Sequence, residues 1–211
     1  GRGPMFILGL TGSIGMGKST AAAQLRRLGL PVHDADAAVH ALMGPGGAAV
    51  AAVDDAFPGV VKNGAVDRQA LGAKVLGDDA ALKRLEAILH PLVRRSEKKF
   101  LAACARRGAP LVVLDIPLLF ETGGDARCDA VLVVHCRPAL QRRRVLARPG
   151  MTEERFQAIL ARQVPAREKI WLGDFTVNTG IGRHAALMDL KRIVKLLRTC
   201  TGRVWAPSSY W

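Results

Sequence analysis

The chain has 211 residues and a formal net charge of +13, from 31 lysines and arginines against 18 aspartates and glutamates. No apolar run approaches the roughly 18 residues of a membrane-spanning helix, so the sequence predicts no membrane partner. Only 5% of the residues are aromatic, so a nucleic-acid-binding surface would be poorly supplied with stacking side chains. A basic surface also suits a small polyanionic substrate such as a nucleotide. We therefore expect small-molecule partners and no nucleic acid.

The four cysteines, at positions 104, 128, 136 and 200, form no C-x-x-C pair, so neither zinc nor a disulfide framework is expected. Residues 1–4 precede Met5 and are expected to be a cloning remnant. No secretory signal pattern follows, because the first apolar run leads directly into a loop. The expected location is the cytoplasm, and the expected state is a monomer.

The most specific motif is G-x-x-x-x-G-K-[ST] at residues 12–19. An apolar run at residues 5–10 predicts a strand before it, and residues 19–28 predict a helix after it. In this context backbone N–H groups and a helix N-terminus hold phosphate oxygens. Lys18 can reach the β- and γ-phosphates, and the Ser19 hydroxyl can bind Mg²⁺. The motif predicts a nucleoside triphosphate site.

Further apolar runs alternate with helical patterns, which predicts a parallel sheet with helices on both faces. We expect a short strand at residues 30–33, buried strands at residues 111–114 and 130–134, and a last short strand at residues 175–177.

Two segments are too long or too basic to be simple connections. Residues 37–107 are almost wholly helical in pattern, with breaks at residues 44–47 and 59–65. His90-Pro91 is expected to end one helix of this segment, with Pro91 as the first residue of the next. Residues 142–167 are rich in arginine and are interrupted by Pro149-Gly150.

A phosphate loop alone does not distinguish kinases from switch or motor proteins. Several other short motifs indicate which class of nucleotide-binding protein this is. Taken together, and in this order and spacing, they resemble the motifs of the dephospho-coenzyme A kinase family. They are Gly9-Leu10-Thr11-Gly12, Asp34-Ala35-Asp36, Leu89-His90-Pro91, Pro117-Leu118-Leu119-Phe120-Glu121 and Asp174-x-x-x-Asn178-x-Gly180.

The resemblance implies a P-loop NTPase fold, an α/β fold with a five-stranded parallel sheet flanked by helices. It implies transfer of the ATP γ-phosphoryl group to the ribose 3′-hydroxyl of dephospho-CoA, with ATP and Mg²⁺ as cofactors. Residues 5–211 would form a single kinase domain with a core at about 5–43, 108–140 and 168–203. A helical CoA-substrate insertion would occupy about 44–107, and a lid about 141–167.

The resemblance also assigns roles to residues. Asp36, Lys18 and Arg144 are expected to be catalytic, with Asp36 as the base toward the hydroxyl. Mg²⁺ would be held by Ser19. Asp115 is a candidate partner on other grounds, because it closes the apolar run at residues 111–114. The ATP-binding residues would be Gly12, Ser13, Ile14, Gly15, Met16, Gly17, Lys18, Ser19, Thr20, Arg148, Asn178 and Gly180. The dephospho-CoA-binding residues would be Thr11, Asp36, His90, Pro91, Pro117, Leu118 and Glu121.

Some of these residues also suit plainer roles. Asp36 could cap the helix at residues 37–43, although Asp34 could equally do so and is expected to be structural. His90 could be a capping or packing histidine, and Asp115 could cap a helix. The lid arginines could form a solvated helix face, and Asn178 could belong to an ordinary turn.

The sequence departs from the family pattern at three positions: Ser13 and Gly173 replace a usual glycine and alanine, and Pro149 stiffens the lid turn. Another small-metabolite or nucleoside monophosphate kinase would share the loop and the arginine lid but would not explain His90-Pro91 or residues 117–121. A guanine-nucleotide switch is disfavoured because the chain has no N-K-x-D motif. A nucleic-acid-binding module is supported by the net charge and by no other feature of the sequence.

Overall fold

The computed structural model describes residues 4–205 of the chain. They form two compact units, one of residues up to His33 together with those from Ala102 onward, and one of Asp34–Leu101. Each unit has a buried apolar core of its own. The expected cloning remnant lies outside the described residues except for Pro4, and so do residues 206–211 of the C-terminal tail.

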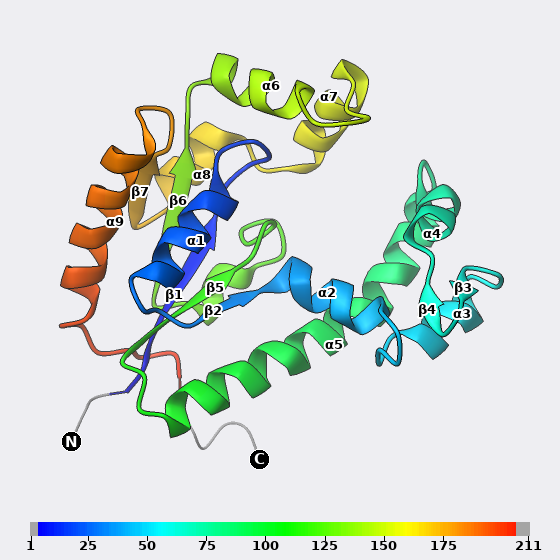
Figure 1. The fold of residues 1–211 in the computed structure, drawn as a ribbon, viewed down its shortest axis with the longest axis horizontal. Helices are drawn as coiled ribbons and strands as arrows, with labels where there is room; N and C mark the ends of the chain where they lie inside the picture. The colour runs from blue at the N-terminus through cyan, green and yellow to red at the C-terminus, as the bar shows by residue number, and fades with distance from the viewer. Residues whose placement is uncertain (1–3, 206–211) are drawn as a thin grey trace. The chain divides into compact units, whose positions relative to one another are not determined.

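A parallel sheet lies at the centre of the first unit, with the strand order β2-β5-β1-β6-β7 (Figure 1). This confirms the predicted α/β fold with five parallel strands. In the central strand β1 every residue is buried, and all of them except Thr11 at its end are apolar or glycine, as suits a strand covered on both faces. Leu10 of β1 lies opposite Asp115 of β5 and Leu132 of β6. The strands are β1 Phe6–Thr11, β2 Val32–Asp34, β5 Leu111–Asp115, β6 Ala130–His135 and β7 Phe175–Asn178.

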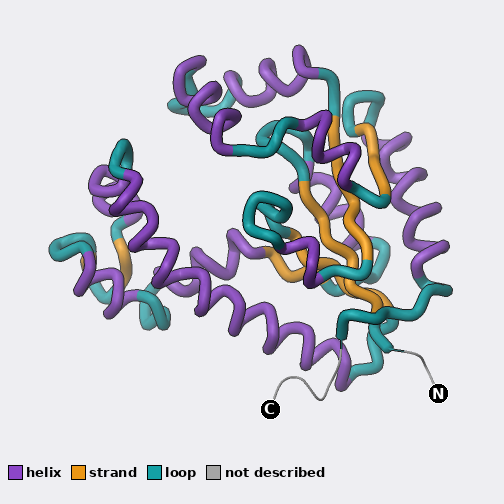
Figure 2. The backbone as a smooth tube through the Cα atoms, turned by 180° about the vertical axis from the view of Figure 1, so that it is seen from behind, coloured by secondary structure: helices purple, strands orange, loops and turns teal. Residues whose placement is uncertain are grey.

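Helices α1 (Lys18–Arg27) and α9 (Arg183–Leu197) pack together on one face of this sheet. Leu25 and Leu190 of these helices share a core with alternate strand residues such as Leu8 and Leu132, and all four are fully buried. Helix α8 (Ala166–Leu172) also contacts β6. Figure 2 shows the strands running side by side with helices along them. The sheet therefore holds the end of β1, where the phosphate loop begins, on a rigid support.

Two helices follow β6 and belong to the same unit. Helix α6 (Pro138–Leu146) starts just beyond the end of β6, and α7 (Glu153–Arg162) contacts it (Figure 1). Pro138 takes the first helical position, where its missing N–H costs nothing. The Thr152 hydroxyl caps α7 by accepting the Arg155 N–H at 3.2 Å. That residues 141–167 act as a lid stays a prediction.

The second unit is mainly helical but contains a hairpin that the sequence analysis missed. Strands β3 (Val61–Lys62) and β4 (Ala65–Val66) pair antiparallel, whereas residues 59–65 were expected to be only a break between helices. Asn63 and Gly64 both have positive φ, at 53° and 75°, as a type I′ turn requires. The helices of this unit are α2 Ala35–Met43, α3 Val50–Ala56, α4 Arg68–Val75 and α5 Asp79–Arg106, whose last turn belongs to the first unit.

Helix α5 runs without interruption through Pro91, so the prediction that His90-Pro91 separates two helices was wrong. A proline inside a helix loses a hydrogen bond and crowds the preceding turn, at a cost of about 3 kcal/mol. Packing outweighs this cost here, because Leu85 and Leu89 are buried in the core of the second unit and Leu92 packs against it. The apolar spacing therefore continues across the proline.

The part of the C-terminal tail that the structure describes packs against the first unit. The Asp129 carboxylate accepts the backbone N–H groups of Arg203 and Val204 at 2.6 and 3.0 Å, and Trp205 is buried.

Among residues 4–205, no helix combines the length and the hydropathy of a membrane-spanning segment.

Candidate active site

The phosphate loop connects β1 to α1, and Lys18 is the first residue of that helix. The loop is kept open by glycines with positive φ, Gly15 at 74° and Gly17 at 91°. A Cβ at Gly17 would lie 2.8 Å from the Thr179 Oγ1 atom, so this position tolerates no side chain. Ser19 and Thr20 are exposed in the first turn of α1. The expected strand–loop–helix arrangement is confirmed.

Lys18 and Asp115 form an ion pair at the ends of α1 and β5. The Asp115 side chain is only 3% exposed, so its carboxylate depends on the chain for compensating charge. Asp115 caps no helix, because a turn follows it and the next helical residues, the 3₁₀ turn η1 Gly124–Arg127, begin nine positions later. The alternative of a capping role was therefore wrong. Asp115 places an oxygen donor beside the lysine of the phosphate loop.

Two glutamines from the segment after β6 hold the backbone of Ile14. The Ile14 N–H donates to Gln163 Oε1 at 3.2 Å, and the Ile14 carbonyl accepts from Gln141 Nε2 at 2.8 Å. Neither glutamine was predicted as a site residue from the sequence. These bonds join the phosphate loop to the α6–α7 region.

Arg144 on α6 is turned toward Thr179, which follows β7. Its guanidinium donates to Thr179 Oγ1 at 3.1 Å and to the Thr179 carbonyl at 3.0 Å. The Thr179 hydroxyl in turn donates to the Met16 carbonyl in the phosphate loop at 2.6 Å. The structure therefore brings together a predicted catalytic arginine and the loop through Thr179, a residue that the sequence analysis missed. Arg148, by contrast, is exposed just beyond α6.

Asn178 and Gly180 form the turn that was weighed as the plainer alternative. The Gly180 N–H donates to Asn178 Oδ1 at 2.8 Å, which is the pattern of an Asx turn. The same turn carries Thr179 between them, so its geometry also sets the position of Arg144. An adenine-binding role for Asn178 and Gly180 stays a prediction.

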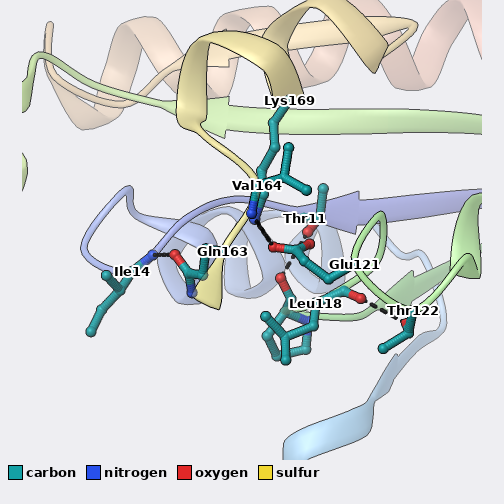
Figure 3. Close-up of polar contacts among 9 residues, drawn as sticks. Thr11, Ile14, Leu118, Glu121, Thr122, Gln163, Val164 and Lys169 are labelled. Atoms are coloured by element: carbon teal, nitrogen blue, oxygen red, sulfur yellow. Dashed lines mark hydrogen bonds and ion pairs between the residues drawn. The ribbon is translucent and has the colours of Figure 1, made fainter. Parts of the chain in front are cut away.

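Residues 117–121 lie in the loop after β5, beside the phosphate loop (Figure 3). The Thr11 hydroxyl donates to the Pro117 carbonyl at 3.1 Å, which ties the end of β1 to this loop. Leu118 is 38% exposed, whereas Leu119 is fully buried. The Glu121 carboxylate accepts the Val164 N–H at 3.0 Å and pairs with Lys169 at 2.9 Å. Leu118 is thus available to a ligand, while Glu121 has partners within the chain.

Burial shifts the pKa values of two side chains near the phosphate loop. Burial lowers the pKa of His135, the last residue of β6, and so favours its neutral form. Burial also raises the pKa of Cys136, although the nearby Arg144 opposes that shift. The Cys136 N–H lies 3.1 Å from the Met16 sulfur. A protonated, buried thiol here supports the loop and is no nucleophile.

The remaining predicted residues lie in the second unit. Asp34 caps α2 by accepting the Ala37 N–H at 3.0 Å, which confirms its structural role. Asp36 is exposed in the first turn of α2 and is not the cap. His90 and Pro91 are exposed on α5. The carboxylate of Asp36 and the ring of His90 are therefore both accessible to a ligand.

Comparison with known proteins identifies the family of this chain. The family model for dephospho-CoA kinase matches residues 6–182. The chain belongs to the dephospho-CoA kinase family. This confirms the resemblance drawn from the motifs and the class of enzyme, a kinase of coenzyme A biosynthesis. Membership of a kinase family also implies the use of ATP.

Curated relatives of this chain are named dephospho-CoA kinase. The one from Paramagnetospirillum magneticum is 65% identical over 92% of each chain. The one from Mesorhizobium japonicum is 57% identical over 92% of this chain and 98% of its own. A crystal structure of a Thermus thermophilus protein is 37% identical with a TM-score of 0.79, covering 92% of this chain and 97% of its own. The dephospho-CoA kinase family fold thus extends over most of the chain.

Proposed function

We propose that this chain transfers the γ-phosphoryl group of ATP to the ribose 3′-hydroxyl of dephospho-CoA, which gives coenzyme A and ADP. The family match carries the proposal, and the phosphate loop with Lys18 at the start of α1 supports it. In this step the hydroxyl oxygen bonds to the γ-phosphorus and the bond from that phosphorus to the β-phosphate oxygen breaks. Such transfer depends mainly on positioning and on stabilisation of charge.

The ATP phosphates would be held by residues 12–20. Backbone N–H groups of the loop and the N-terminus of α1 attract the phosphate oxygens. Lys18 and Arg144 would stabilise the negative charge on the transferring group, and Arg148 would add a further cation. Asn178 and Gly180 would border the adenine. The fixed positions of Lys18 and Arg144 in the first unit support these roles.

The residues beside Lys18 suit a magnesium ion. Mg²⁺ prefers oxygen ligands and is commonly held by one or two protein groups together with substrate phosphates. Ser19 offers an exposed hydroxyl and Asp115 a carboxylate next to the lysine. When bound, the ion would neutralise charge on the β- and γ-phosphate oxygens.

For the acceptor, we propose binding by Asp36, His90 and Pro91 of the second unit and by Thr11, Pro117 and Leu118 of the first. Asp36 would act as the general base that takes the proton of the 3′-hydroxyl. Asp36 is exposed, and α2 is capped by Asp34 instead, and both observations support this role. Exposed Leu118 supports an apolar contact with the acceptor. We also propose a monomeric cytoplasmic enzyme without a nucleic-acid partner.

A coupled assay of ADP release tests this function. The protein is given ATP and Mg²⁺ with dephospho-CoA, AMP, adenosine or pantothenate in parallel. Turnover with dephospho-CoA alone is the expected result. Turnover with AMP would instead make it a nucleotide kinase. ATP binding without turnover on any acceptor would contradict the kinase proposal.

A further inference from the structure

Lys169 is a lysine that the fold buries completely. It is the largest fully buried side chain in the described part of the chain, with 0% exposure, and it lies on α8. Burying an ammonium group costs several kcal/mol unless a carboxylate compensates it. The Nζ atom lies 2.9 Å from Glu121 Oε2. This expensive arrangement needs an explanation that packing alone does not supply.

The same carboxylate oxygen also holds the backbone of Val164. Glu121 Oε2 accepts the Val164 N–H at 3.0 Å, while the other oxygen, Oε1, is buried and receives no hydrogen bond from any described residue. One oxygen is therefore shared between a charge and a backbone N–H (Figure 3). A charged acceptor binds such an N–H more strongly than a neutral one does.

Val164 lies between the two helices α7 and α8, directly after Gln163. Gln163 Oε1 accepts the Ile14 N–H of the phosphate loop at 3.2 Å. Glu121, Val164, Gln163 and Ile14 thus form one chain of contacts, which starts in the loop after β5 and ends at the phosphate loop (Figure 3). Fixing the backbone at Val164 limits where the Gln163 side chain can go.

We infer that Glu121 and Lys169 are positioning residues: the Glu121 carboxylate, whose buried charge Lys169 compensates, fixes Val164 by accepting its N–H, so that Gln163 is held against the phosphate loop during phosphoryl transfer. The catalytic part of this inference rests on the proposed function. The inference gives Glu121 a role other than the predicted contact with dephospho-CoA. Small displacements of groups around a reacting centre are enough to slow such a reaction strongly.

Two double variants separate positioning from mere packing. E121M/K169M removes both charges and the acceptor of the Val164 N–H, whereas E121Q/K169M removes both charges but keeps an acceptor oxygen. Neither leaves a buried charge unpaired, so both are expected to fold. The control is D189N, which alters an exposed ion pair with Arg192 on α9. Calorimetry verifies that each variant folds. If E121M/K169M unfolds, Q163A tests the same contact with the phosphate loop while the ion pair stays intact.

The readouts are steady-state kinetics in both substrates and amide hydrogen exchange of residues 163–165. For E121M/K169M we expect kcat/KM for ATP to fall about tenfold, an unchanged KM for dephospho-CoA, and faster exchange. The kcat/KM for ATP of E121Q/K169M should lie within about threefold of the parent value, and that of D189N should equal the parent value. Q163A should show the loss in kcat/KM for ATP while Val164 stays protected.

Three results would overturn the inference. Parent-like activity and exchange in both double variants would mean that the pair only fills space. A raised KM for dephospho-CoA in both would return Glu121 to the acceptor site. Normal kinetics in Q163A would disconnect the contacts from catalysis. If the parent protein did not act on dephospho-CoA, the proposed function would fail, while the exchange comparison would still decide whether the pair fixes Val164.

Discussion

Arg144 and Thr179 are joined by two hydrogen bonds, one from the guanidinium to the threonine hydroxyl at 3.1 Å and one to its carbonyl at 3.0 Å. The same hydroxyl donates to the Met16 carbonyl at 2.6 Å. A planar guanidinium held at two points keeps one orientation. The arginine of α6 is therefore fixed relative to the phosphate loop through Thr179.

Replacing Thr179 by valine should impair catalysis through Arg144. Valine has the shape of threonine but lacks the hydroxyl, so the contacts of that group with Arg144, Met16 and the His135 carbonyl are lost. We expect kcat to fall about tenfold in T179V, and T179S to stay within about threefold of the parent. Steady-state assays at saturating ATP measure this. Parent-like activity in T179V, or a loss confined to T179S, would show that the hydroxyl does not carry the effect.

Removing Lys18 should reduce both turnover and stability, for separable reasons. We expect K18A to lose about 10²-fold or more in kcat, because a cation at the transferring phosphoryl group is gone. The thermal midpoint should also fall, because the buried Asp115 carboxylate loses the ammonium group that it pairs with.

Adding D115N to K18A separates the two effects. The midpoint should recover because no buried charge remains, whereas turnover should stay low. Calorimetry and the coupled assay on the same samples measure this. Recovery of turnover with stability would mean that Lys18 acts only on the fold.

Substitution of Asp36 should affect catalysis, whereas substitution of Asp34 should affect stability. D36N should keep ATP binding and cut kcat about 10²-fold or more, as loss of a general base does. D34A should lose about 1 kcal/mol of unfolding free energy, because it removes the cap of α2. Urea unfolding and kinetics on both variants distinguish these roles. An unchanged kcat in D36N would contradict the base assignment.

Replacing His90 by alanine should weaken binding of the acceptor. The side chain is exposed on α5, so the thermal midpoint should hardly change. We expect the KM for dephospho-CoA to rise about tenfold and the KM for ATP to stay constant, as for a group that binds the substrate and the transition state equally. A fall in ATP affinity alone would show that the acceptor site has been misplaced.

Local patterns predicted most of the fold. The phosphate loop, the strands and the cap at Asp34 each depend on residues that are close in the sequence. The errors arose where distant packing overrides a local rule: Pro91 stays inside α5 because Leu85 and Leu89 before it are buried and Leu92 after it packs against the same core. The Asn63-Gly64 hairpin was readable from the sequence, since this dipeptide favours a type I′ turn. Its strands have only two residues each, too few to show the alternating pattern that predicts a strand.

The missed site residues have a common cause. Thr179 contacts Met16 and Arg144, and Lys169 contacts Glu121, across 163, 35 and 48 positions respectively. No periodicity or spacing records such pairs. Thr179 could have been suspected because it lies inside the Asn178-x-Gly180 motif. A lysine such as Lys169 in an amphipathic helix is normally solvated, and only the structure reveals its burial.

His135 should make the stability of the fold depend on pH. Burial lowers the pKa of this histidine in the folded state, whereas an unfolded histidine titrates near about 6.5. The unfolded chain therefore binds the extra proton first as the pH falls, so the free energy of unfolding is full above about pH 6.5 and decreases below it. Glu97 acts in the opposite sense, because burial raises its pKa and protonation then favours the folded state. Comparing H135Q with the parent in urea at pH 7.5 and 5.5 cancels the Glu97 contribution, which both proteins share. H135Q should lose less stability between these two pH values, and parallel losses would mean that His135 does not carry the effect.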